Sequence, residues 1–270
     1  MAENDKPKEH DEIVEDQIKL GFRDYERSSV GLSLSAFTAG LEIGFSVMLM
    51  GILHAMFSGK VDPEVLHLII SLGYPLGFIF VIIGRSELFT EQTALAILPV
   101  LNGKASVGEL LRLWGFVILG NLVGGLLFAL FITWIGPESG RIPAESFEHI
   151  AKVMVEPNWQ ITLGSAVLAG WMMGLLGWLI SSVRESISHI VIVIFITLII
   201  GVGGLHHCIV GNIEVLSGML VSDSISLGDY LEFLAFAIIG NTVGGAFFVS
   251  VLKYSQMKAG NQSKSAAEKF

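Results

Sequence analysis

Six long apolar segments, separated by short polar stretches, occupy most of the chain. Each is at least as long as the ~20 residues that an α-helix needs to cross the hydrocarbon core of a bilayer. The pattern therefore predicts an all-α integral membrane protein with six transmembrane segments. Their predicted bounds are Val30–Phe57, Val65–Leu101, Val107–Ile135, Trp159–Val183, Ser186–Val221 and Leu227–Tyr254.

The second and fifth segments are too long for one straight helix, and polar residues interrupt each of them. The first interruption is Gly84–Gln92; the second is Gly204–Asn212, which contains two histidines and a cysteine. Ionisable groups inside a bilayer are costly and usually line a pore or a substrate site. Irregular backbone at that depth is tolerated only beside protein or a water-filled cavity. We expect both segments to break near the middle of the membrane, and the two breaks to form the functional centre.

The chain also repeats itself. Gly120–Phe128 and Gly240–Phe248 agree at six of nine positions with an offset of 120 residues, which pairs Gly84 with Gly204. Each half then holds three transmembrane segments, an odd number, so the halves have opposite orientations. This arrangement is a 3+3 inverted repeat, in which the site lies at the midplane between broken helices. We predict one channel or transporter domain over residues 30–254, with halves at about 30–135 and 159–254.

Both ends of the chain are polar. Residues 1–29 hold an acidic tail followed, from Ile13, by an amphipathic helix, and residues 255–270 form a second polar tail. The helix is acidic, whereas membrane-binding helices are rich in Lys and Arg, so we expect it to pack on the protein itself. If the N-terminus is inside, the inner segments after Lys19 hold nine Lys and Arg residues and the outer loops three. This asymmetry predicts that both termini are cytoplasmic.

Composition narrows the function. Hydrophobic residues make up 52% and charged residues 15% of the chain, whereas a soluble domain is about a quarter charged. The expected surroundings are a lipid bilayer, and no basic stripe indicates a nucleic-acid partner. Phosphate-loop and dinucleotide-binding patterns are absent. His206, His207 and Cys208 lack the spacing of a zinc site. We therefore predict neither enzyme activity nor a cofactor or metal.

Four short motifs, in order along the chain, resemble those of the formate/nitrite transporter family. The resemblance implies a transporter or channel for small monovalent anions, with an aquaporin-like protomer that has its own pore and assembles as a homopentamer. It further implies a bacterial inner (plasma) membrane, and it places the family's central pore histidine on His207. The similarity runs from about Val30 to Tyr254, and the motifs are Glu87–Thr90, Gly120–Gly124, Gly204–His207 and Gly240–Gly245.

The chain departs from the family pattern near the predicted pore. His206 stands where the family has an acid, and Asn212 lies one residue further from His207 than the family's asparagine. The other departures are Arg85 and Ser86 in place of a small-residue pair, Tyr74 followed by Pro75 at one constriction, Phe78 at a second, and Lys152 displaced from an outer lysine.

The candidate pore residues each have a functional and a structural interpretation. We expect the His207 imidazole to hydrogen-bond the anion and exchange a proton with it, with Thr90 supplying a hydroxyl; the alternative is a core histidine that bonds free backbone. For His206 we favour the structural role, because adjacent side chains point about 100° apart around a helix. Apolar collars around the pore, or ordinary helix packing, account for Leu88, Phe89, Phe78 and Tyr74; we favour collars for Phe89 and Phe78, because the repeat places them beside the break.

Polar residues near the breaks are expected to support them. Glu87 is placed to cap backbone amides freed by the break. Arg85 either pairs with Glu87 or lies in the pore mouth. Asn121 and Asn241, which occupy equivalent repeat positions, are expected to bond the backbone of the broken segments. Lys152 either concentrates anions at the outer mouth or is an ordinary solvated lysine.

Three functions remain open at this point. The first is a channel or transporter for a small weak-acid anion of the formate, nitrite or hydrosulfide type. The second is a channel for a small neutral solute or ammonia, suggested by the altered surroundings of His206. The third is a membrane receptor or scaffold whose pore no longer conducts.

Overall fold

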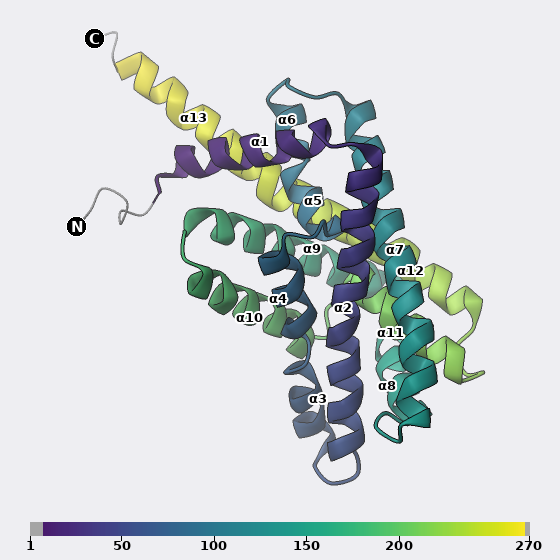
Figure 1. The fold of residues 1–270 in the computed structure, drawn as a ribbon. Coiled ribbons are helices and arrows are strands. Elements are labelled where there is room, and N and C mark those ends of the chain that lie inside the picture. The colour runs from purple at the N-terminus through teal and green to yellow at the C-terminus, as the bar shows by residue number, and fades with distance from the viewer. Residues whose placement is uncertain (1–7, 268–270) are drawn as a thin grey trace.

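A computed structural model describes residues 8–267, and all regular structure in that range is helical (Figure 1). The helices are α1 (His10–Glu26), α2 (Ser29–Phe57), α3 (Pro63–Ser71), α4 (Pro75–Gly84), α5 (Phe89–Leu95), α6 (Ile97–Leu101), α7 (Val107–Glu138), α8 (Ala144–Val155), α9 (Trp159–Ser182), α10 (Ser186–Val202), α11 (Cys208–Val221), α12 (Leu227–Gly245), the π-helix η2 (Ala246–Val251) and α13 (Leu252–Ala267).

Four helical runs in the described range are long and apolar enough to cross a membrane, judged by length and composition. They are α2, the α3–α4 run (Pro63–Gly84), α7 and α9. The remaining apolar helices α5–α6, α10 and α11 are shorter, as expected of pieces of broken segments. The chain is an all-α membrane protein, and the six predicted segments are consistent with this set of helices.

The second predicted segment contains two more interruptions than the sequence pattern indicated: one between α3 and α4, and a short one at Ala96 between α5 and α6. Instead of one break, Val65–Leu101 forms α3, α4, α5 and α6. The interruption between α3 and α4 precedes Pro75, which cannot donate a backbone hydrogen bond. Ser46 on α2 satisfies the backbone there: its hydroxyl donates to the Tyr74 carbonyl at 2.6 Å and accepts from the Gly77 amide at 2.8 Å.

Both central breaks are shorter than the sequence pattern indicated. The helix resumes at Phe89 after the first break and at Cys208 after the second, whereas the polar stretches run on to Gln92 and Asn212. A helix can begin inside a membrane only where its first amides find acceptors. Each break has such acceptors, and they come from distant helices.

Two helix pairs related by the repeat pack through glycines. On α7, a Cβ at Gly124 would collide with the Phe37 carbonyl of α2; on α12, a Cβ at Gly244 would collide with the Val167 carbonyl of α9. Small residues let membrane helices approach this closely. The pairs α2–α7 and α9–α12 therefore occupy corresponding places in the two halves.

The repeat register differs from the prediction by one residue at the breaks. Arg85 ends α4 in the left-handed conformation (φ 59°), and Gly204 has the same conformation (φ 57°) after α10. The structural partner of Gly204 is therefore Arg85, not Gly84, because the second half has one more residue between the break and α12. The offset of 120 residues was taken from identical residues in α7 and α12, and between these two helices it holds without the extra residue.

Helices α1 and α13 lie side by side, whereas α3 and α8 lie at the opposite end of the molecule (Figure 1). We call these ends the terminal face and the distal face. The apolar side of α1 packs on its own protein, in a cluster with Leu98, Trp178 and Tyr254. The region predicted as a polar tail from residue 255 is helical as far as Ala267, and residues 1–7 and 268–270 of the predicted tails lie outside the described residues.

Candidate functional site: two mirrored helix breaks

Asn121 on α7 holds the first break together. It is fully buried, and its Oδ1 accepts a hydrogen bond from the Phe89 amide at 2.8 Å. Its Nδ2 donates to the Glu87 carbonyl at 2.8 Å and to the Ala36 carbonyl of α2 at 2.7 Å. One amide side chain therefore satisfies the backbone on both sides of Leu88, and it also bridges to α2.

Asn241 on α12 makes the same set of bonds at the second break. Its Oδ1 accepts from the Cys208 amide at 2.8 Å, and its Nδ2 donates to the carbonyls of His206 at 2.9 Å and Ala166 at 2.8 Å. The two networks match bond for bond. The inverted repeat thus extends from the helices to the hydrogen bonds that support the breaks.

His207 and Thr90 meet where the two breaks face each other. The His207 Nε2 and the Thr90 hydroxyl are 2.9 Å apart, and both residues are at most 1% exposed. The His207 Nδ1 accepts from the Ile209 and Val210 amides at 3.2 and 3.3 Å, so His207 is the N-cap of α11. Because Nδ1 accepts, the proton of the neutral ring is on Nε2, which donates to Thr90.

Aromatic rings continue from His207 toward the distal face. Phe78 lies edge-on to the His207 ring at a centroid distance of 5.2 Å, and Tyr74 stacks on Phe78 at 5.5 Å. Leu88, which ends the first break, is fully buried. The Phe89 ring points toward Trp114 of α7, at 6.2 Å between centroids. Phe89 therefore packs against α7.

His206 and Asn212 face protein rather than the centre. The His206 ring contacts the Ser165 hydroxyl at 2.8 Å through Nδ1 and the Met154 carbonyl at 3.2 Å through Nε2. The fully buried Asn212 accepts from the Tyr230 hydroxyl of α12 at 2.8 Å and packs against Gly125 of α7. Asn212 thus lies between α7 and α12.

Glu87 pairs with Arg27, which the sequence did not single out. Arg27, at the end of α1, contacts the Glu87 carboxylate directly and lies 3.6 Å from Asp24. Gln92 donates to both Glu87 and Asp24. Burial raises the pKa of Asp24, while the Gln92 hydrogen bond and the Arg27 charge oppose that rise. This network joins α1 to the first break.

Arg85 does not form the predicted ion pair with Glu87. Its backbone is left-handed, its side chain is exposed, and no ion pair within residues 8–267 involves it. Lys152 on α8 is bound to Glu148 at 2.6 Å. Arg85 lines the hollow on the terminal face, whereas Lys152 lines neither of the two hollows described below.

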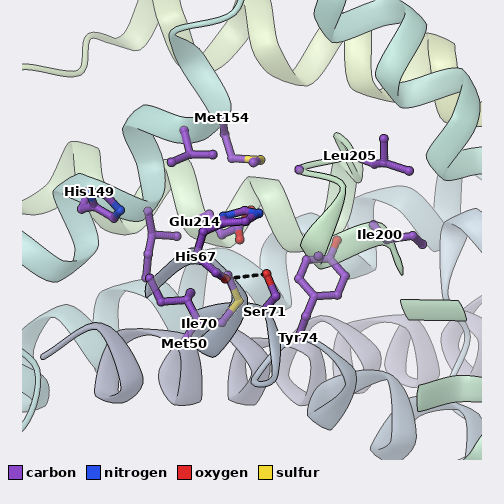
Figure 2. Close-up of a pocket in the computed structure, with 14 residues that line it drawn as sticks. Met50, His67, Ile70, Ser71, Tyr74, His149, Met154, Ile200, Leu205 and Glu214 are labelled. Carbon is purple, nitrogen blue, oxygen red and sulfur yellow. Dashed lines mark hydrogen bonds between the residues drawn. The ribbon is translucent and has the colours of Figure 1, made fainter. Parts of the chain in front are cut away.

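Two hollows approach the centre from opposite faces. The hollow on the terminal face has a volume of about 590 Å³, and its lining includes Arg27, Arg85, Glu87 and Glu91. The hollow on the distal face is about 40 Å³ and lies between α3, α8 and the second break (Figure 2). Between them stand buried side chains, all at most 4% exposed: Tyr74, Phe78, His207, Thr90 and Leu88.

The sequence analysis missed three residues that line the distal hollow: Glu214, His67 and His149 (Figure 2). Glu214 carried a detectable signal, because it is an acid within the apolar stretch that follows the second break. Within the described residues, no group of three His, Cys, Asp or Glu side chains is arranged to hold a metal ion.

Known proteins resemble this chain in sequence and in fold. The family described as formate/nitrite transporter matches residues 11–255. Inner membrane protein YfdC of Escherichia coli (strain K12) is 30% identical over 262 residues, which cover 96% of this chain and 81% of that protein. A solved FNT family ion channel superposes with a TM-score of 0.80 at 21% identity, covering 90% of this chain and 98% of that one. A pentameric formate channel with formate bound superposes with a TM-score of 0.71 at 22% identity, covering 84% and 96%. The matches confirm the resemblance and the all-α channel fold, and the chain belongs to the formate/nitrite transporter family.

Proposed function

We propose that this protein is a channel or transporter for a small monovalent weak-acid anion of the formate, nitrite or hydrosulfide class. The observation that carries the proposal is the Thr90–His207 pair, which is buried between two hollows that open to opposite faces. Membership of the formate/nitrite transporter family and the fold of a pentameric formate channel support it. Each protomer has its own pore, and five protomers form the assembly.

The pair acts on the anion as a short chain of hydrogen bonds. His207 Nε2–H donates to the Thr90 oxygen, which strengthens the Thr90 hydroxyl as a donor toward an anion in the pore. An anion crossing this region loses its hydration, at a cost of several kcal/mol or more, and the donated hydrogen bond offsets part of that cost. Any proton exchange at His207 runs through Nε2, because Nδ1 accepts the two amides of α11.

The remaining candidates keep the roles assigned above as proposals. Tyr74, Phe78 and Leu88 form apolar collars on either side of the pair and exclude hydrated ions. Arg85 attracts anions at the terminal hollow, and Lys152 does so near the distal face. The protein lies in a bacterial inner membrane, as its family resemblance implies, and both termini are in the cytoplasm, as the Lys and Arg distribution indicates.

The test is stopped-flow uptake of formate and nitrite into proteoliposomes. Thr90→Val removes the hydroxyl at nearly constant size, whereas Thr90→Ser keeps it and serves as the matched control. A hydrogen bond to a charged group contributes about 1.5–3 kcal/mol, so Thr90→Val is expected to slow uptake by about 10- to 150-fold. Thr90→Ser is expected to stay close to the wild type.

A further variant separates the two roles of His207. Asparagine at this position keeps an N-cap acceptor for α11 but cannot exchange a proton near neutral pH. If His207→Asn folds and loses the rise in uptake between pH 7 and pH 5, proton exchange at the ring is supported. Uptake of an uncharged solute without formate or nitrite uptake would instead identify a neutral-solute channel. Binding without any flux would identify a non-conducting receptor.

A further inference from the structure

The distal hollow contains an acidic side chain that the pair at the centre does not use. Glu214 lies on α11, seven residues after His207, and it is 2% exposed. Its carboxyl group faces the hollow, which it lines together with Tyr74 and Leu205 (Figure 2). Within residues 8–267, Glu214 makes no hydrogen bond or ion pair with another side chain or with the backbone.

The groups that face Glu214 from the neighbouring elements do not neutralise it. α3 contributes His67, α8 contributes His149, and Tyr74 precedes α4. The His67 Nε2 is bound to the Val202 carbonyl at 2.9 Å, and His149 stacks on His54 of α2 at 4.5 Å. No other titratable side chain from the described residues lines the hollow. In the part of the chain described, no lysine or arginine lines this hollow.

The size of the hollow makes Glu214 decisive for any ligand inside it. A volume of about 40 Å³ is room for a few water-sized groups, which suits a molecule with three or four heavy atoms. In such a space an ionised carboxylate repels an anion, and the low-dielectric walls strengthen that repulsion. A protonated carboxyl group does the opposite, because its O–H donates a hydrogen bond to the anion. Occupancy by an anion is therefore linked to one proton.

We propose that Glu214 is a proton-binding substrate subsite: it admits a weak-acid anion from the distal face only together with one proton. One H⁺ from the distal solution binds a Glu214 carboxylate oxygen, and the resulting O–H donates to an oxygen of the anion. The proton then moves to that oxygen, and the neutral acid passes along Tyr74 and Phe78 toward the Thr90–His207 pair. Glu214 is left ionised until it binds the next proton.

This inference rests on the proposed function and deepens it. It assigns proton binding to the distal hollow, where solvent supplies protons, and leaves the hydrogen-bonding of the passing molecule to Thr90 and His207. A channel that passed the anion without a proton would not be expected to have an acidic side chain at this place, because a fixed negative charge repels the anion. Glu214 is compatible with anion transport only if a proton accompanies the anion.

The test is the pH dependence of formate binding to the purified, oligomeric protein, measured by saturation-transfer NMR between about pH 6 and pH 10, where formate is ionised. In the wild type the affinity is expected to be constant while Glu214 of the empty protein is protonated, and to fall about tenfold per pH unit above the pH at which that carboxyl group ionises, because binding is linked to one proton. Glu214→Gln keeps the size and a hydrogen-bond donor but no proton, so its affinity is expected to be flat over this range. Glu64→Gln removes an exposed acid on α3 and is expected to keep the wild-type slope.

The outcomes separate this inference from the proposed function. If Glu214→Gln keeps the tenfold slope, the proton binds elsewhere and the inference is overturned, while wild-type flux leaves the proposed function intact. If the wild type neither binds nor transports formate or nitrite, both fall. Should the variant not fold, infrared difference spectra of the wild type decide. Addition of formate at a pH where Glu214 of the empty protein is ionised is expected to produce the band of a protonated carboxyl group, and its absence would overturn the inference.

Discussion

The mirrored asparagines offer the sharpest test of how the breaks are held. Replacing Asn121 by leucine keeps the side-chain volume but removes all three of its hydrogen bonds. The Phe89 amide is the first of α5 and has no partner within that helix, and the Glu87 carbonyl lies in the break, so both lose their partner. The Ala36 carbonyl lies inside α2 and keeps its acceptor role in that helix. We therefore count two orphaned groups.

A buried backbone group without a partner costs about 1–3 kcal/mol. Two of them predict a loss of about 2–6 kcal/mol for Asn121→Leu. Asn241→Leu is expected to lose a similar amount, because its bonds to Cys208 and His206 have nearly the same lengths. The unfolding free energy is measured by titrating micelle-solubilised protein with denaturant and following tryptophan fluorescence.

A matched control isolates the effect of the breaks. Asn158 caps α9 with one bond to the Ile161 amide at 3.1 Å on an exposed residue, and its loss costs about 1 kcal/mol. Asn158→Ala is therefore expected to be the mildest of the three variants. If Asn121→Leu or Asn241→Leu costs no more than Asn158→Ala, the two networks do not hold the breaks, and the reasoning is refuted.

Three further predictions use the same protein. Arg85→Gly is expected to stabilise it by about 1 kcal/mol, because a side chain in the left-handed region is strained; a destabilised variant would show that the Arg85 side chain contributes contacts of its own. Gly244→Ala is expected to cost about 1–3 kcal/mol by forcing α12 from α9, whereas Gly115→Ala, with open space around it, is expected to be neutral or slightly stabilising. Finally, α1 is expected to dock less firmly as the pH rises above about 4. Because the pKa of Asp24 is raised in the docked state, docked α1 holds the Asp24 proton more tightly than undocked α1. The contribution of this proton to the docking free energy is therefore complete below pH 3.8, the ordinary pKa of the side chain, and is lost as the pH rises through the raised pKa. Hydrogen exchange of α1, corrected for the intrinsic rate, measures it, and an unchanged pH dependence in Asp24→Asn would contradict the assignment.

The sequence by itself determined the class of protein and the place of its centre. The transmembrane segments and their breaks can be located from local composition, because the thickness of the bilayer sets the length of an apolar segment and polar groups in its hydrocarbon core are costly. The repeat of Gly120–Phe128 in Gly240–Phe248 was enough to predict opposed halves, and Asn121 and Asn241 stood out because they recur. These features can be recognised in the sequence because each depends on the residues of a single segment or of a repeated motif.

The tertiary structure decided which partners each polar group has. The sequence shows that Glu87 is acidic but not which residue pairs with it. Its partner is Arg27, sixty residues earlier in the chain, rather than the neighbouring Arg85. The breaks end at Leu88 and His207 because asparagines on α7 and α12 accept the next amides. Glu214 lines a hollow only because α3 and α8 meet α11 there. Contacts between distant segments depend on packing geometry, which residue pattern alone does not encode.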